Sequence, residues 1–338
     1  MYTMPNIITH KIFAEEVYKR ITKKDIKDMI EKHFQLYYIG SNGPDFLFFY
    51  HAKPWESFKD HQLNHIGSAL HKGHVDAFYD SAVASILKEK DSYTKESEAA
   101  YVMGHLCHWA LDMMSHPYIF YRTGDCLGNS AGLHHRFESM MDTMMLQKYH
   151  QLDISNYRSY EICEYDEEML KAIARIYVPA VKHALSEDVK VYHLREALDG
   201  WKDIQKLLYD PSNKKAAILK GVEKALRKPW AISGNVVPKN IDETYDILNE
   251  QHREWSHPCD ASIVSTASFI DLFEQAVEVA VVLLEKLYGC IEYGADVAGL
   301  LHLLQDRAYD TGMSGEQEMK YFDVIYENKP KEDADETI

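Results

Sequence analysis

One stretch, Tyr101–Tyr121, constrains the fold most, because it places regularly spaced polar residues inside an apolar frame. It reads YVMGHLCHWALDMMSHPYIFY, in which His108, Asp112 and His116 stand four residues apart. On an α-helix, a step of four residues rotates by only about 40°, so the three side chains form one stripe. Their apolar neighbours indicate burial, and a buried charge requires a partner or a metal ion.

A second pair with the same spacing follows, formed by His134 and Glu138 in GLHHRFESMMD. Imidazole and carboxylate groups on facing helices are how helical bundles build metal sites. Two simpler interpretations stay open. Histidines such as His105, which lies nearly on the stripe, commonly pack in cores, and an i,i+4 pair can be a surface ion pair. Repetition of the pair and its apolar frame favour a metal site.

Histidine is concentrated in the first half of the chain. Ten of the 18 histidines lie between His51 and His135, a local density that favours a site over scattered structural roles. The net charge of −16 repels nucleic-acid phosphate and anionic lipid, so stable nucleic-acid binding is not expected. Divalent ions gathered in a cleft would reverse that sign locally.

Cysteine usage and the apolar runs indicate where the protein resides. The cysteines are scattered, odd in number and without CxxC spacing, which argues for a reducing compartment: Cys107, Cys126, Cys163, Cys259 and Cys290. No signal peptide is visible, and the longest apolar candidate, around Ala276, is broken by Glu278 and Glu285. The expectation is a cytoplasmic protein without a transmembrane segment.

The periodicity predicts an all-α fold, a multi-helix bundle. We expect one domain over residues 1–325, with a metal-ligand half at 1–150, a helical scaffold or insertion at 155–240, and closing helices at 241–325. Asn64–Lys88 reads as one helix and Asp242–Glu254 as another, and no strand-like alternation of any length is present. Residues 326–338 are acidic and predict a disordered tail.

Six short segments carry the candidate ligands in a fixed order. Counted as six pieces, they are ITH with His10, GPDFLFFY with Asp45, SALH with His71, the His108–Asp112 pair and then His116 in CHWALDMMSHPY, and HHRFESMMD. Asp45 follows Pro44, so a turn aspartate that caps the next segment is the simpler interpretation of it. His65 and His74 are alternatives to His71.

This order resembles the zinc-dependent phospholipase C family, which shares its all-α fold with single-strand-specific nucleases. The resemblance is convincing over residues 5–145, and LNEQHREWSHPCDASIV also looks like a family segment near the cleft. It implies two or three zinc ions. Asp45, His71, His108 and Asp112 would surround one, and His116, His134 and Glu138 a second. His10 would hold a third, with Asp112 bridging.

The third zinc is where the chain departs from the family pattern. Secreted members also use the free N-terminal amine for that ion, whereas here nine residues precede His10. MPNIITH, which starts at Met4, looks like the usual opening of the family, so that MYT would be an upstream extension.

The expected activity is metal-dependent hydrolysis of a phosphodiester, with a phospholipid headgroup or a smaller diester as substrate. Paired zinc ions activate a bound water, and Asp45 is the candidate catalytic carboxylate for that water. A nuclease-like phosphodiesterase and a non-catalytic zinc-stabilised binding protein are the alternatives. No HExxH or GxxxxGK[ST] motif supports a zincin or a P-loop protein.

Overall fold

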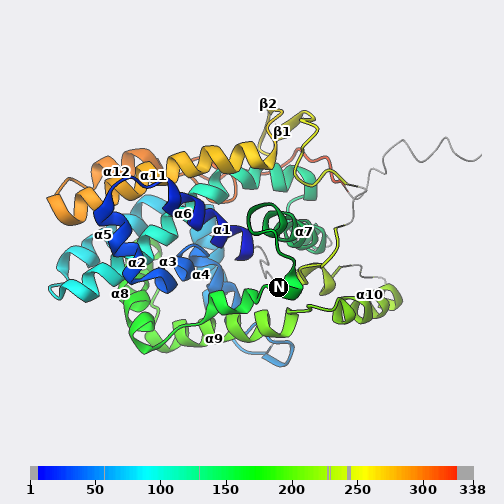
Figure 1. Ribbon diagram of the computed structural model, residues 1–338, viewed down its shortest axis with the longest axis horizontal. Coiled ribbons are helices and arrows are strands. Elements are labelled where there is room, and N and C mark those ends of the chain that lie inside the picture. The colour runs from blue at the N-terminus through cyan, green and yellow to red at the C-terminus, as the bar shows by residue number, and fades with distance from the viewer. Residues whose placement is uncertain are drawn as a thin grey trace, which may run out of the picture.

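The structure, a computed structural model, is built almost entirely of helices (Figure 1). It describes residues 7–56, 58–128, 130–226, 228, 230–241 and 245–325. The expected opening at Met4 and the expected tail at 326–338 lie outside these residues. The α-helices in the described ranges are α1 Ile7–Arg20, α2 Lys24–Lys32, α3 Phe34–Gly40, α4 Gln62–Lys72, α5 Val75–Lys88, α6 Ser92–Thr123, α7 Ser130–His150, α8 Glu167–Leu185, α9 Val191–Leu208, α10 Lys214–Leu226, α11 Phe269–Tyr293 and α12 Ala298–Leu304.

Short elements complete the chain. They are the 3-10 helices η1 Gly43–Phe49, η2 Pro54–Glu56, η3 Ile154–Asn156, η4 Ser159–Cys163 and η5 Ser233–Asn235, and the strands β1 Trp255–His257 and β2 Asp260–Ser265. The predicted all-α class is confirmed, because the strands form only one antiparallel hairpin. No helix among the described residues is long and apolar enough to span a membrane.

Helix α6 is the central element of the fold. Its side chains are buried on every face from Ser97 to Met113, as expected for a helix whose neighbours surround it. It packs against α1, α3, α8 and α11. Asp91 caps its first turn, with a carboxylate oxygen 2.9 Å from the Thr94 amide nitrogen. Pro117, expected near an end or kink, lies inside α6, which continues to Thr123.

The predicted single helix Asn64–Lys88 is wrong, because two residues break it into α4 and α5. Gly73 is extended, with φ 162°, and His74 is left-handed, with φ 61°, so the helix cannot continue through them. The break ends α4 just after His71, whose side chain is buried, and leaves His74 exposed. It therefore decides which histidine of this segment faces the interior.

The prediction of a helix at Asp242–Glu254 is also wrong where the structure describes it. Residues 245–254 form turns, and the hairpin β1–β2 follows, contrary to the expected absence of strands. Nearly every residue of β2 is exposed. A strand with both faces in water has no alternation of apolar and polar residues, so periodicity did not indicate it.

Most buried apolar side chains of the described residues form one connected cluster with members from Ile7 to Ile325. Figure 1 shows α11 and α12 along one long side, α9 along the opposite side and α10 at one end. Within the region expected as scaffold or insertion, α8 packs on α5 and α9 packs on η1. We infer that the described residues form one domain, in which α8 and α9 support η1 as scaffold.

Candidate metal centre

All eight predicted ligands come together in the interior. They form three groups whose ligand atoms lie within 4.8 Å of one another: His10, His108 and Asp112; Asp45, His71 and His108; and His116, His134 and Glu138. Every member is buried. The described residues contain no further group of this kind. His108 belongs to two groups, so the first two are joined into one larger cluster.

Five elements deliver these side chains. The first turn of α1 carries His10, η1 carries Asp45, the last turn of α4 carries His71, and α6 and α7 carry the two i,i+4 series. Gly43, with φ 43°, allows η1 to pass directly against α6, because a Cβ there would lie 2.1 Å from the His108 ring. The turn before Asp45 therefore presses that carboxylate against the histidine of α6.

Asp112 is the most connected carboxylate of the centre. One of its oxygens lies 3.4 Å from His10 Nε2, and the other lies 3.0 Å from His108 Nε2 and 3.8 Å from His116 Nδ1. It thus touches the first group and reaches a histidine of the third. The bridging role that the family resemblance implies for Asp112 stays a prediction.

Three histidines have their rings oriented by hydrogen bonds from Nδ1. His71 Nδ1 donates to the Gly67 carbonyl at 2.8 Å, and His116 Nδ1 lies 3.3 Å from the Tyr309 carbonyl. Thr123 Oγ1 donates to a backbone carbonyl and therefore accepts from His134 Nδ1 at 3.0 Å. Each bond leaves Nε2 facing a carboxylate, that of Asp45 for His71 and that of Glu138 for the other two. A hydrogen bond to the other ring nitrogen fixes the orientation of a histidine that binds a metal.

Several buried polar atoms of the centre lack a hydrogen-bond partner. They are His108 Nε2, Asp112 Oδ2 and both carboxylate oxygens of Glu138. His108 Nε2 lies close to Asp112 Oδ2, yet the two are not aligned as a hydrogen bond. A buried, unsatisfied polar atom is costly, and a cation placed between these atoms would satisfy them together. The imidazole and carboxylate donors are those that zinc prefers.

Protons take the place of cations in the metal-free centre. Burial lowers the pKa of His108, but Asp112 and Asp45 outweigh burial and raise it to about 10. His116 is raised to about 9 in the same way, mainly by Asp112 and Glu138. Burial raises the pKa of Glu138, and its histidine neighbours hold it below the usual value. Zinc would bind by displacing these protons.

The other candidate histidines lie elsewhere. His65 and His74 are exposed and belong to none of the three groups. His105 is buried, with Nδ1 at 2.8 Å from the Tyr79 hydroxyl and Nε2 at 3.0 Å from the Tyr177 hydroxyl. Both of its nitrogens are used by tyrosines, so His105 is a core residue, as its place outside the motif indicates.

A cleft of about 380 Å³ opens onto the centre. His71 and His134, from two different groups, both line it. Its other walls include Phe48 and Phe120, together with Lys72 and Asp310. The aromatic rings supply apolar surface, and the histidines bring the candidate metal positions within reach of a ligand in the cleft.

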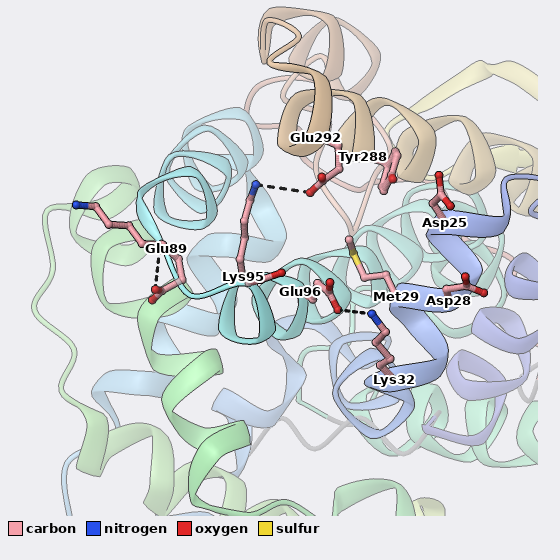
Figure 2. Close-up of a pocket in the computed structure, with 11 residues that line it drawn as sticks. Asp25, Asp28, Met29, Lys32, Glu89, Lys95, Glu96, Tyr288 and Glu292 are labelled. Carbon is pink, nitrogen blue, oxygen red and sulfur yellow. Dashed lines mark hydrogen bonds and ion pairs between the residues drawn. The ribbon is translucent and has the colours of Figure 1, made fainter.

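A second hollow, between α2, α6 and α11, is a different kind of surface (Figure 2). Its acidic side chains face lysines: Lys32 lies 2.9 Å from Glu96, and Lys95 lies 3.6 Å from Glu292. No histidine or cysteine lines it. These are solvent-exposed ion pairs of small energetic value, and they do not resemble a metal site.

Sequence reasoning missed the contribution of the C-terminal part of the chain. Tyr309 supplies the carbonyl beside His116, and its ring lies 5.2 Å from that of His71. His257, in the segment that looked family-like, contacts the Thr311 carbonyl through Nε2 at 2.8 Å. No spacing in QDRAYDTGM connects these residues to the stripe, because their proximity arises only when α6 and the C-terminal part pack together.

Comparison with known families agrees with the geometry. A family model described as zinc dependent phospholipase C matches residues 9–187, more than half of the chain. The match includes all eight residues of the three groups and ends before α9. No curated protein and no solved structure matches the chain.

Proposed function

Since the chain belongs to the zinc-dependent phospholipase C family, we propose that it hydrolyses a phosphodiester, either in a phospholipid headgroup or in a smaller soluble compound. The observation that carries the proposal is the set of unsatisfied buried atoms on His108, Asp112 and Glu138, beside a cleft that reaches His71. A cytoplasmic location, expected from the sequence, is part of the same proposal.

The proposed ligand sets are those implied by the family. Asp45, His71, His108 and Asp112 would hold one zinc ion, and His116, His134 and Glu138 would hold a second. His10 would hold a third, with Asp112 contributing to it as well. Their support is the short separation of the donors, such as 2.9 Å from His71 Nε2 to Asp45 and 3.3 Å from His134 Nε2 to Glu138.

Zinc and residues of the chain have separate roles in the proposed hydrolysis. When bound, zinc polarises phosphoryl oxygens and lowers the pKa of a water toward about 7. Asp45 lies 2.9 Å from Nε2 of His71, a residue that lines the cleft, and we assign it the role of orienting that water and taking its proton. The water oxygen bonds to phosphorus, the bond from phosphorus to the alcohol oxygen breaks, and the alcohol oxygen gains a proton from solvent.

Two alternatives receive less support. Single-strand nucleases share the fold, but the net charge of −16 disfavours a polyanionic substrate. A zinc-stabilised binding protein would have closed coordination, whereas here histidines of two groups line an accessible cleft. Phe48 and Phe120 in that cleft favour a substrate with an apolar portion.

The test is hydrolysis of a nitrophenyl phosphocholine by the zinc-loaded protein, with zinc content measured by elemental analysis. We expect two or three zinc ions per chain, activity that is lost to a chelator, and recovery when zinc is returned. Replacement of Asp45 by Asn should reduce turnover more than it reduces the zinc held by His116, His134 and Glu138.

Two results would contradict the proposal. Less than one metal ion per chain after zinc loading would remove the metal centre itself. A zinc-loaded protein that cleaves neither diesters nor monoesters from pH 5 to pH 9 would favour the binding-protein alternative. Activity on single-stranded nucleic acid alone would favour the nuclease alternative.

A further inference from the structure

Residues 305–325, called here the C-terminal segment, lie outside the family match and reach the metal centre. The Asp310 amide donates to the His71 carbonyl at 3.3 Å, and the Trp109 indole donates to the Arg307 carbonyl at 2.8 Å. The Tyr309 ring lies 5.6 Å from that of His108. The segment is thus fastened to both α4 and α6 at the level of the ligands.

A proline and a glycine fit the segment closely to α6. Pro117 has no amide hydrogen, so it leaves the Met113 carbonyl without its usual helical donor. Gly312, with φ 63°, packs against that carbonyl, and a Cβ there would lie only 2.4 Å from the oxygen. A tight turn, with the Gly312 amide 2.9 Å from the Ala308 carbonyl, sets the position of the residues between them.

Asp310 lies within this turn, and its carboxylate faces the cleft. Asp310 lines the cleft together with His71 and His134, and its carboxylate forms no hydrogen bond or ion pair within 4.0 Å among the described residues. Its charge is near enough to both His71 and His116 to raise the pKa of each, although burial and nearer groups act more strongly on them. Asp310 therefore lies near His71 of one ligand group and His116 of another.

We propose that Asp310 is a further catalytic residue, whose carboxylate accepts a hydrogen bond from the water that attacks the phosphodiester. The inference rests on the proposed function and deepens it. A water has two hydrogens, so Asp45 from η1 and Asp310 from the C-terminal segment can hold it from two sides. Two hydrogen-bond acceptors fix the orientation of the water, whereas a single acceptor does not.

The geometry favours a water contact over direct coordination. Asp310 belongs to none of the three groups whose ligand atoms lie within 4.8 Å of one another. A carboxylate that lines the same cleft but lies outside these groups contacts the metal centre through an intervening water molecule. Lys72, which also lines the cleft, forms no ion pair with it, so no described residue occupies the carboxylate.

The experiment compares Asp310→Ala and Asp310→Asn with the wild-type protein, all zinc-loaded. Zinc content, kcat and KM for a nitrophenyl phosphocholine are measured for each. We expect full zinc content in both variants, and a kcat about tenfold or more lower in Asp310→Ala with KM changed less than threefold. Asp310→Asn keeps an acceptor oxygen and should lose less of kcat.

The matched control is Glu316→Gln, which removes the same charge from an exposed residue of the same segment. Its kcat should stay within about twofold of the wild-type value, which separates a local effect from a change in net charge. Thermal unfolding of each variant shows whether the turn is intact.

Each other outcome overturns the inference in a recognisable way. Zinc loss in Asp310→Ala as large as that in Asp112→Ala would make Asp310 a ligand. A higher KM with unchanged kcat would show that Asp310 contacts the substrate. Unchanged zinc content and unchanged kcat would show that Asp310 has no role in the reaction. A wild-type protein that is inert would instead contradict the proposed function, on which the role of Asp310 depends.

Discussion

His105 and His108 stand one turn apart on α6, yet their rings meet different surroundings. Tyrosine hydroxyls occupy both nitrogens of His105, so its polar atoms are satisfied within the core. His108 Nε2 points between Asp45 and Asp112 and has no hydrogen bond. A residue whose donors are already used stabilises the fold, whereas one left unsatisfied between two carboxylates is suited to bind an ion.

We expect Asp112→Ala to lower zinc content by at least one ion per chain, because Asp112 lies 3.0–3.8 Å from nitrogens of His10, His108 and His116. His105→Ala should keep its zinc but lower the free energy of unfolding by about 2–4 kcal/mol, through a cavity and the loss of the side-chain hydrogen bonds to Tyr79 and Tyr177. Elemental analysis after dialysis and urea unfolding check the two variants. Equal loss of metal from both would show that the stripe is wrongly assigned.

At the scale of the elements, the crossing of α3 and α6 positions the centre. Gly40 on α3 and Gly104 on α6 lie at this crossing, where the backbones almost touch. A Cβ at Gly40 would lie 2.2 Å from the Tyr101 carbonyl oxygen, and one at Gly104 would lie 2.0 Å from that of Tyr37. Because α3 leads into η1, this close approach also determines where Asp45 stands.

We expect Gly104→Ala to lower the free energy of unfolding by at least about 2 kcal/mol, because the added methyl group meets backbone that cannot turn aside. The matched control is Gly221→Ala on α10, where an added Cβ meets nothing within 4 Å. There the better helix propensity of alanine should add about 0.5–1 kcal/mol. Urea unfolding measures both, and similar values for the two would contradict the packing described.

At the scale of the whole molecule, the metal centre joins parts of the chain that are far apart in sequence. Its ligands come from α1, η1, α4, α6 and α7, and the C-terminal segment lies against them. Without metal, buried carboxylates and histidines hold this region together by sharing protons. Zinc would link the same elements with stronger bonds, so metal binding and folding are coupled.

We expect chelation to lower the melting temperature of the protein and zinc to restore it. A ligand that binds only the folded state stabilises it by about 2.7 kcal/mol when present at 100 times its Kd. Differential scanning calorimetry with chelator and with zinc measures the change. Asp112→Ala, which has lost a bridging ligand, should respond much less, and no shift in the wild-type protein would contradict the coupling.

The chelated protein should also become less stable at alkaline pH. The pKa values of His108, about 10, and His116, about 9, lie above the unfolded value of about 6.5. A raised pKa means that the folded state binds protons more tightly, so this stabilisation is complete below pH 6.5 and is lost as pH rises through 9 to 10. Zinc-loaded protein, whose histidines carry no such protons, should lack this loss.

The sequence alone was sufficient to predict the features that depend on residues close together along the chain. Apolar periodicity predicted the helical class, and the spacing of His108, Asp112 and His116 placed them on one stripe, because helix geometry alone relates residues four apart. The order of segments from His10 to Glu138 indicated the family, whose model matches that region. Those inferences needed no knowledge of how the helices pack.

Features that depend on residues far apart in the sequence were decided only by the tertiary structure, because packing brings these residues together. Gly73 and His74 end α4 so that His71, and neither His65 nor His74, is buried with Asp45. The hairpin β1–β2 carries no periodic signal, because its second strand lies in water. Asp310 faces His71 across some 240 positions of sequence, and that contact exists only because the C-terminal segment closes against α4 and α6.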